Sequence, residues 1–185
     1  MILQLTNLFF PVGLVLLIVL GLSFINFLLK IEVYFGIIPR KLGLTTVARW
    51  FLSWGVHADK NHLINNLMSF LPLLFIFFVL LDQSLSIFFY VVIAQSIATW
   101  MFGSSKYYYV GASGVIYALF GYIVTYVLID HTTYAQWIAA ITVFLTMGLN
   151  MFYGLIKVDK DVSSLAHLLG LLSGVGVQYF NHGFV

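Results

Sequence analysis

Residues 70–81, with the sequence FLPLLFIFFVLL, are apolar at every position. Strands of outer-membrane barrels alternate polar and apolar residues, so a segment that is apolar on every face favours a helix in lipid, where the backbone groups are paired within the segment. The composition agrees, because 62% of the 185 residues are hydrophobic and only 8% are charged, against about 25% charged residues in a soluble domain. The sequence therefore excludes a soluble globular protein, and its high hydrophobicity excludes a disordered chain.

Six runs without Asp, Glu, Lys or Arg extend over most of the chain, and each is long enough for a spanning helix, which needs about 20 residues. They predict an all-α membrane protein with six transmembrane helices, at residues 8–29, 62–81, 84–103, 112–129, 134–155 and 163–181. The first run has no basic segment before it and is longer than the apolar core of a signal peptide, so we expect it to be retained. The connections are too short for a separate soluble domain, and we therefore expect residues 1–185 to form a single membrane domain.

The longest connection, residues 30–60, joins the first two predicted helices. It contains five of the eight Lys and Arg residues together with several aromatic residues, a combination that favours a loop half embedded at the membrane surface. All eight Lys and Arg residues fall in the first, third and fifth connections. The positive-inside rule would place these three connections in the cytoplasm.

Three polar clusters interrupt the apolar pattern, at residues 57–66, 111–117 and 166–174. Polar side chains are costly in lipid, so such clusters are candidate functional sites. His167 lies inside an apolar run, with no acidic residue within five positions on either side. Its imidazole either bonds to a neighbouring helix for structural reasons or serves as a base, and the hydroxyl of Ser113 is the nucleophile that such a base would activate.

Glycines surround Ser113 in the sequence. Gly111 and Gly114 permit a tight turn into a helix and a close approach of the backbone. At the start of a helix the backbone N–H of Ser113 has no partner within the helix, and it can point at a developing oxyanion. Gly114 and Gly170 each begin a row of small residues at helical spacing, which predicts that the fourth and sixth helices approach closely. A hydrogen bond between Ser113 and His167 requires such an approach.

Three further residues share helix faces with these candidates or with one another. Tyr117 lies four residues after Ser113, and it either packs as an ordinary aromatic residue or stacks on the ring of His167 and fixes its orientation. His62 and Asn66 are also four residues apart and offer N–H donors for an oxyanion. Both would equally suit a helix end that meets interfacial water.

A metal site is not expected. His57 and His62 are close in sequence, but no acidic or cysteine ligand lies at a matching spacing and the zinc pattern His-Glu-x-x-His is absent. The chain has no cysteine, so it has no thiolate nucleophile and no disulfide. No cofactor is expected, and the net charge of +2 is too small to indicate a nucleic-acid partner.

Together these residues resemble the motifs of the rhomboid intramembrane serine proteases. Three motifs occur in the family's order and on the predicted helices: His62-x-x-x-Asn66, Gly111-Ala-Ser113-Gly114 and Ala166-His167-x-x-Gly170. Tyr117, His57 and Arg49 also lie at matching spacings. The resemblance extends over essentially the whole chain and implies a six-helix rhomboid-like bundle.

The resemblance implies a serine endopeptidase that cleaves transmembrane-helix substrates within the membrane. Ser113 would attack the peptide carbonyl, and His167 would act as general base and then as general acid. The Asn66 side chain, His62 and the backbone N–H of Ser113 would hold the oxyanion. The residues that would support this site are Gly111, Gly114, Tyr117, His57 and Gly170. The partners would be spanning protein substrates and the lipid bilayer, with no nucleic acid and no metal.

The resemblance also implies a location, an orientation and a route for substrate. The chain would be a multi-pass protein of the cell (inner) membrane, and its site would open to the outside, opposite to what the positive-inside rule predicts. Substrate would arrive between the second and fifth helices. A bulky lining suited to a gate, or to plain contact with lipid, is formed there by Phe70, Phe75, Phe77, Trp137, Phe144 and Phe152.

Two other functions are alternatives. A non-catalytic rhomboid-like protein that binds spanning helices would share the fold, but it would not need both Ser113 and His167. A small channel or transporter would be expected to have inverted repeats or acidic residues within the membrane. Neither is present, since Asp82 and Asp130 lie in connections.

Overall fold

The structure is a computed structural model that describes residues 2–130, 133–148 and 164–183. The helices are α1 (Ile2–Leu29), α2 (Glu32–Phe35), α3 (Thr46–Leu52), the 3₁₀ helix η1 (Ser53–Gly55), α4 (Lys60–Phe75), the π-helix η2 (Ile76–Leu80), α5 (Leu85–Phe102), α6 (Ser113–Ile129), α7 (Tyr134–Val143), the π-helix η3 (Phe144–Gly148) and α9 (Ser164–Gly183). No strand occurs in these residues, and the predicted all-α membrane fold is confirmed.

The helices correspond to the predicted spans with differences at their ends. Helix α1 begins six residues before the first predicted span, 8–29, and ends at the same residue. The spans expected at 62–81, 84–103 and 112–129 correspond to α4 with η2, to α5 and to α6, and each end differs by two residues or fewer. Helix α9 begins one residue later than expected and ends two residues later. The fifth span begins at Tyr134 as expected, and its predicted residues 149–155 lie outside the described part of the chain.

Polar side chains determine where three of these helices begin. Asp59, Ser84 and Thr133 each accept a hydrogen bond from the backbone N–H three residues later, at the starts of α4, α5 and α7. Such caps pair N–H groups that a helix leaves without an internal partner. Helix α6 differs, because the residue before it, Ala112, provides no side-chain cap. The first N–H groups of α6, including that of Ser113, are therefore not paired by a cap.

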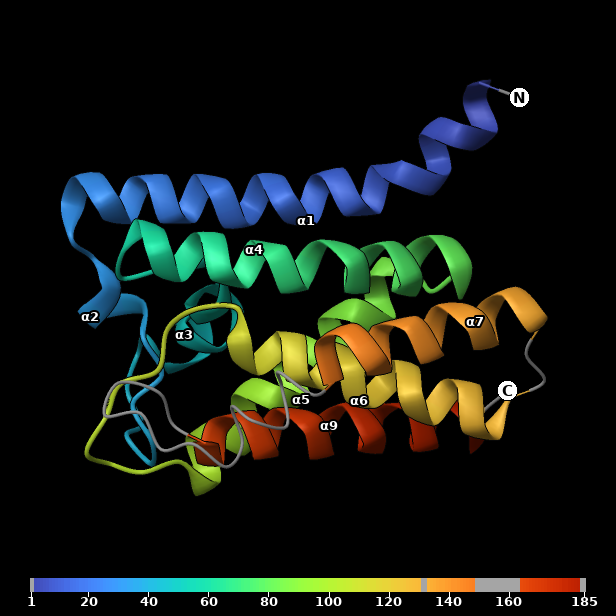
Figure 1. Cartoon of the computed structure of the whole chain (residues 1–185). Helices are drawn as coiled ribbons and strands as arrows, with labels where there is room; N and C mark the ends of the chain where they lie inside the picture. Colours follow the sequence, from blue (N-terminus) through green and yellow to red (C-terminus); the bar gives the residue numbers. More distant parts are fainter. Residues whose placement is uncertain (1, 131–132, 149–163, 184–185) are drawn as a thin grey trace.

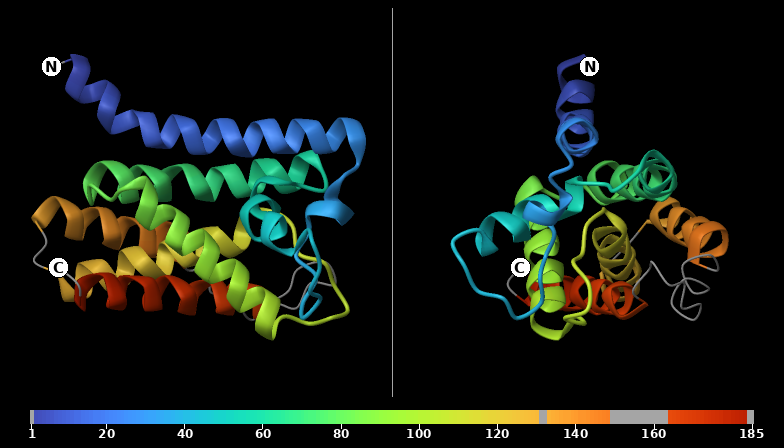
Figure 2. Two further views of the ribbon diagram at one scale, coloured as in Figure 1. Left: turned by 180° about the vertical axis from the view of Figure 1, so that it is seen from behind. Right: turned by 90° about the vertical axis from the view of Figure 1, so that its left-hand side faces the viewer.

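The long helices lie side by side, with α6 near the middle and α1 at one edge beside α4 (Figures 1 and 2). Helices α2 and α3 and the connection before α6 gather at one end of the bundle, where α4, α6 and α9 begin. The start of α1 and the end of α9 lie at the opposite end. The first turns of three helices are thus collected next to the long first connection.

Three helices among the described residues are long and apolar enough to cross a membrane: Phe9–Leu29, Lys60–Leu80 and Leu85–Phe102. Helices α6 and α7 are shorter and also apolar. Large apolar side chains project from the outside of the bundle, among them Phe24, Leu28, Ile138 and Leu172. An apolar surface of this extent is stable against lipid rather than water. The chain is therefore an integral membrane protein.

Glycines bring the backbones of α6 and α9 into contact. A Cβ atom added to Gly170 would collide with the carbonyl oxygen of Gly114. One added to Gly174 would collide with the carbonyl group of Ala118 and would lie 2.9 Å from the backbone nitrogen of Tyr122. The close approach of the two helices, expected from the spacing of small residues, is confirmed.

The first connection folds against the loop that precedes α6. Arg49 donates hydrogen bonds to the carbonyl oxygens of Val33 (3.2 Å) and Gly36 (2.6 Å) and so holds the connection together. Ile37 and Tyr109 exchange two backbone hydrogen bonds of 2.9 Å each. Large apolar side chains of the connection remain exposed: Val33, Tyr34, Leu42 and Leu44. Such exposure agrees with the expectation of a loop half embedded at the membrane surface.

Of the three aromatic residues expected to line a gate on the second span, two are buried against other helices and the third, Phe75, is 41% exposed. Phe70 and Phe77 are fully buried, and both rings lie against Phe88 of α5. Phe75 lies against a ring of α1. Large aromatic residues suit a gate and also fill the core of a helical bundle, so their size alone does not distinguish the two positions. On the fifth span, Trp137 and Phe144 are partly exposed and Phe152 lies outside the described residues.

Candidate active site

The residues singled out from the sequence lie at one end of the bundle. Ser113 is the first residue of α6, His62 and Asn66 lie in the first two turns of α4, and His167 is the fourth residue of α9. The beginnings of these three helices are at the same end in Figure 1. Helix N-termini favour nearby negative charge, because their N–H groups point outward and carry the positive end of the helix dipole.

The turn before Ser113 packs directly against His62 and Asn66. Gly111 has a φ of +99°, a left-handed conformation that favours glycine. A Cβ atom at this position would lie 2.6 Å from Cε1 and 2.8 Å from Nε2 of His62, and 3.3 Å from Nδ2 of Asn66. Both the conformation and the contact require glycine. The two proposed oxyanion donors therefore lie beside the residue two positions before the serine.

His167 is held by an aromatic ring on the neighbouring helix. It is 6% exposed, and its ring stacks on that of Tyr117 with centroids 4.2 Å apart and planes within 7° of parallel. The preceding residue, Ala166, lines the same cavity as Ser113. Of the two alternatives for Tyr117, the structure shows the stacking on His167. The first turns of α6 and α9 border one cavity.

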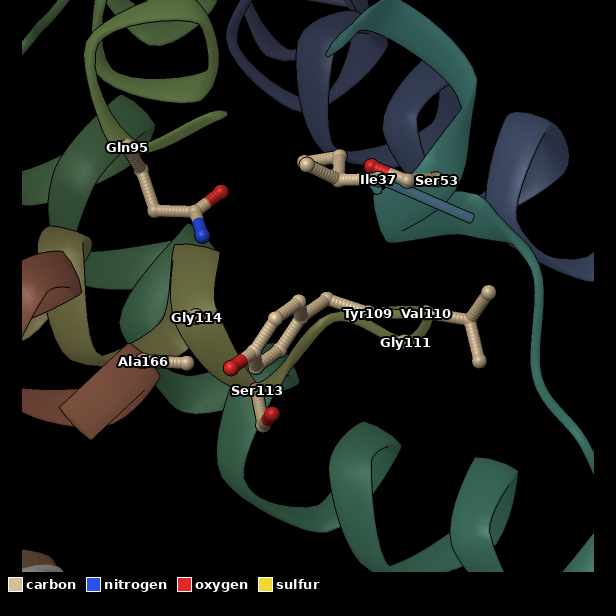
Figure 3. A pocket seen from close by; sticks show the side chains of 9 residues that line it. All are labelled: Ile37, Ser53, Gln95, Tyr109, Val110, Gly111, Ser113, Gly114 and Ala166. Carbon is tan, nitrogen blue, oxygen red and sulfur yellow. The ribbon is translucent and has the colours of Figure 1, made fainter. Parts of the chain in front are cut away.

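The cavity beside Ser113 has a volume of about 30 Å³, which is room for one or two water molecules. Figure 3 shows the side chains that surround it, with the amide of Gln95 pointing toward Gly114. The walls come from the first connection, α5, the loop before α6, α6 and α9: Ile37, Ser53, Gln95, Tyr109, Val110, Gly111, Ser113, Gly114 and Ala166. The cavity therefore has space for water beside Ser113.

His57 connects three parts of the chain at the site. The side chain is fully buried. Its Nδ1 lies 2.9 Å from the hydroxyl of Ser23 on α1, while its Nε2 lies 2.9 Å from Nδ2 of Asn66 and 3.3 Å from the backbone nitrogen of Ala112. The ring of His62 meets that of His57 edge-on, with centroids 5.1 Å apart. His57 is therefore packed between α1, α4 and the residue that precedes the serine.

Burial keeps His57 uncharged. Removal from water, together with the adjacent imidazole of His62, lowers the pKa of His57 from 6.5 to about 4, while a hydrogen bond with the backbone of Gly55 and the charge of Asp59 oppose the shift. A neutral imidazole has one ring nitrogen that donates and one that accepts. His57 can therefore accept hydrogen bonds at Nε2 throughout the physiological pH range.

The stability of the protein should depend on pH through His57. The folded chain protonates this group only near pH 4, whereas an unfolded chain does so near pH 6.5. Between these values the unfolded state binds more protons, so the free energy of unfolding falls as the pH falls from about 6.5 to about 4, by about 3 kcal/mol for this group. Thermal unfolding in detergent from pH 7.5 to 4.5 measures this loss. The dependence should be shallower in His57→Gln, and an equal slope in the two proteins would contradict the assignment.

Three buried polar residues of the site region were not singled out from the sequence. Ser23 and Asn26 lie one turn apart on α1 and are fully buried, and Gln95 lies on α5. Nδ2 of Asn26 donates to the backbone oxygen of His57 at 2.9 Å. The signal that could have revealed them is the occurrence of polar side chains within otherwise apolar spans. Nothing in the local sequence indicates which distant residue they would contact.

Among the described residues, no group of three His, Cys, Asp or Glu side chains is placed to hold a metal ion. His57 and His62 are adjacent, but both ring nitrogens of His57 already have protein partners.

The fold and this arrangement define an integral membrane protein whose polar residues gather around a helix-initiating serine. The family model of the Rhomboid domain matches residues 44–184. The chain therefore belongs to the rhomboid family. No curated protein and no solved structure matches it at a significant level. The matched region contains all the candidate residues named from the sequence, whereas α1 precedes it.

Proposed function

We propose that this rhomboid family member is an intramembrane serine endopeptidase that cleaves transmembrane-helix substrates with a dyad of Ser113 and His167. The observation that carries the proposal is the stacking of His167 on Tyr117, one turn after Ser113. The stacked ring of Tyr117 holds the imidazole of His167 on α9, the helix that packs against the helix beginning with Ser113. The cavity beside Ser113 supports the same reading, because hydrolysis needs a place for water.

In the first half of the proposed reaction, Oγ of Ser113 attacks the carbonyl carbon of the scissile peptide bond while His167 takes the hydroxyl proton. The carbonyl oxygen becomes an oxyanion. The Asn66 side chain, His62 and the backbone N–H of Ser113 donate hydrogen bonds to it. Donors arranged before the reaction typically contribute about 10²–10³-fold each to the rate.

In the second half, His167 gives its proton to the leaving amine, the C–N bond breaks and an acyl group remains on Ser113. A water molecule from the cavity then attacks the acyl carbon, with His167 as its base, and the Ser113 hydroxyl is restored. An acidic residue orients the histidine in soluble triads. Tyr117 takes over this orienting task through its stacked ring in the proposed dyad.

The substrate class and the location belong to the same proposal. A bundle embedded in lipid meets other spanning helices by diffusion within the membrane, so helical membrane proteins are the substrates it would encounter. We place the protein in the cell (inner) membrane, and membrane fractionation checks this location.

A fluorophosphonate probe tests the proposed nucleophile directly, because it forms a covalent bond only with a serine whose hydroxyl is activated. Wild-type protein purified in detergent should be labelled. Labelling should be lost in Ser113→Ala, which has no nucleophile, and in His167→Ala, which has no base. Each variant should keep the thermal unfolding temperature of a folded protein.

Absence of labelling in folded wild-type protein, both in detergent and in lipid, would overturn the proposal. That result would favour the non-catalytic alternative, a rhomboid-like membrane protein that binds spanning helices. Labelling that persists in Ser113→Ala would show that another residue reacts.

A further inference from the structure

Helix α1 lies at the edge of the bundle (Figure 2) and precedes the residues matched by the Rhomboid domain. It nevertheless contacts the candidate site through Ser23 and His57. Most of its described side chains are apolar, and many are exposed. Ser23 is an exception, since it is polar and fully buried. Its hydroxyl lies 2.9 Å from the carbonyl oxygen of Gly55 and 2.9 Å from Nδ1 of His57. A polar group in this position on a peripheral helix indicates a role beyond contact with lipid.

One set of directions satisfies all the hydrogen bonds around Ser23 and His57 together. A carbonyl oxygen can only accept, so the single hydroxyl proton of Ser23 is donated to Gly55. Toward His57, Oγ of Ser23 must therefore accept, and the proton of the neutral imidazole must be on Nδ1. At the other side of the ring, the backbone N–H of Ala112 can only donate, so Nε2 must accept. Both ends of the ring require the same tautomer.

The tautomer of His57 decides how the amide of Asn66 points. With a lone pair on Nε2, the ring accepts one N–H of the Asn66 side chain at 2.9 Å. The second N–H of the same Nδ2 atom is then available to an oxyanion. With a proton on Nε2, two donors would face each other, and the amide would have to turn its carbonyl oxygen to the ring. An amide turned in this way also changes which of its atoms faces the oxyanion.

We propose that Ser23 is a positioning residue, which fixes His57 in its Nδ1-protonated tautomer and thereby holds the amide of Asn66 in the orientation that donates to the oxyanion. The inference rests on the proposed protease function, in which Asn66 is an oxyanion donor. It extends the site to α1, outside the matched region. The titratable groups that face His57 are His62 and Asp59, and its other contacts come from Ser23, Asn26, Asn66, Ala112 and the backbone of Gly55.

The first test measures the tautomer in the wild-type protein. Histidine labelled with ¹⁵N in the ring distinguishes a protonated nitrogen from one with a free lone pair by NMR, and the His57 signals are assigned by their absence in His57→Gln. We expect Nδ1 to be protonated and Nε2 to be unprotonated at pH 7. The opposite tautomer in the wild-type protein would overturn the proposal without any variant having to fold.

The second test measures the rate of fluorophosphonate labelling in variants of Ser23. Ser23→Ala removes the acceptor for Nδ1–H, and we expect labelling to slow by about tenfold or more, as for loss of one well-placed donor to the oxyanion. Ser23→Thr keeps a hydroxyl and should recover the wild-type rate to within about threefold. Ser173→Ala serves as the matched control, because the Ser173 hydroxyl only donates to Leu169 within α9. It should label at the wild-type rate.

Asn26→Ala distinguishes the effect of the Ser23 hydroxyl on the imidazole of His57 from the effect of packing α1 against the site. It removes a buried hydrogen bond from α1 to the backbone of His57 and leaves the partners of the ring in place. We expect a lower unfolding temperature with the Nδ1-protonated tautomer retained. Loss of this tautomer in Asn26→Ala as well as in Ser23→Ala would mean that the contact with α1, rather than the Ser23 hydroxyl, fixes the ring, and it would overturn the proposal.

The two proposals fail in different ways. Folded wild-type protein that does not label overturns the protease function, and with it the role of Asn66. Wild-type protein that labels, together with a folded Ser23→Ala variant that labels equally fast, overturns only the role of Ser23.

Discussion

Ser113→Ala is expected to abolish cleavage of a spanning-helix substrate, with a fall in kcat of at least about a thousandfold. The substitution removes the proposed nucleophile, the Oγ atom of Ser113. The fold should survive, because the side chain is short and α6 is held by contacts further along, such as that between Gly174 and Ala118. Cleavage is measured by gel electrophoresis of a membrane-protein substrate reconstituted with the enzyme in liposomes.

Ser173→Ala is the matched control for this experiment. It is the same chemical change on the neighbouring helix, and it removes only a hydroxyl that bonds to Leu169 within α9. Cleavage should continue at close to the wild-type rate. Equal cleavage by Ser113→Ala and the wild type would exclude Ser113 as the nucleophile, whereas a loss of cleavage in both variants would point to general damage to the bundle.

Gly174→Ala is expected to destabilise the protein by about 1–3 kcal/mol, the range typical of overpacked interiors. The added methyl group would collide with the carbonyl group of Ala118 and lie 2.9 Å from the backbone nitrogen of Tyr122. These are backbone atoms, which cannot move aside as the end of a flexible side chain can. Relief requires α6 and α9 to separate, and separation would also weaken the stack between Tyr117 and His167. Activity should therefore fall together with stability.

Gly176→Ala is the control for this substitution. Gly176 lies two residues further along the same helix, and no atom outside its own helix lies within 4 Å of the position of its added methyl group. Alanine favours a helix over glycine by roughly 1 kcal/mol, so this variant should be as stable as the wild type or slightly more stable. Thermal unfolding in one detergent compares the two variants. Equal unfolding temperatures would contradict the close contact between the helices.

The helical fold could be predicted because lipid imposes a simple requirement on the sequence. A spanning segment must be long, apolar and free of charge, and these properties can be counted residue by residue. The π-helical turns Ile76–Leu80 and Phe144–Gly148 could not be predicted in this way, because they depend on local hydrogen-bond shifts within an otherwise helical run. The sequence also did not predict that Phe70 and Phe77 face the core. Their segment is apolar on every face, and such a pattern does not distinguish a side chain in the protein core from one that faces lipid.

The site could be predicted where its geometry is local. Tyr117 follows Ser113 by one helical turn, and glycine at position 111 is required by a single positive φ. The hydrogen-bond partners of His57 are different, because they lie 34, 9 and 55 positions away in the chain. No periodicity relates positions so far apart, and only the packing of α1 against the site brings Ser23 and His57 together.

The division of the proposed dyad between α6 and α9 has a consequence for biosynthesis. Ser113 and the donors on α4 are made and inserted into the bilayer before the segment that bears His167 leaves the ribosome. During that interval the serine has no base, so a nascent chain cannot hydrolyse the helices of other proteins that are being inserted beside it. In the proposed protease, the site would become active only when α9 inserts against α6, and the glycines along that contact would make proteolysis depend on completed assembly.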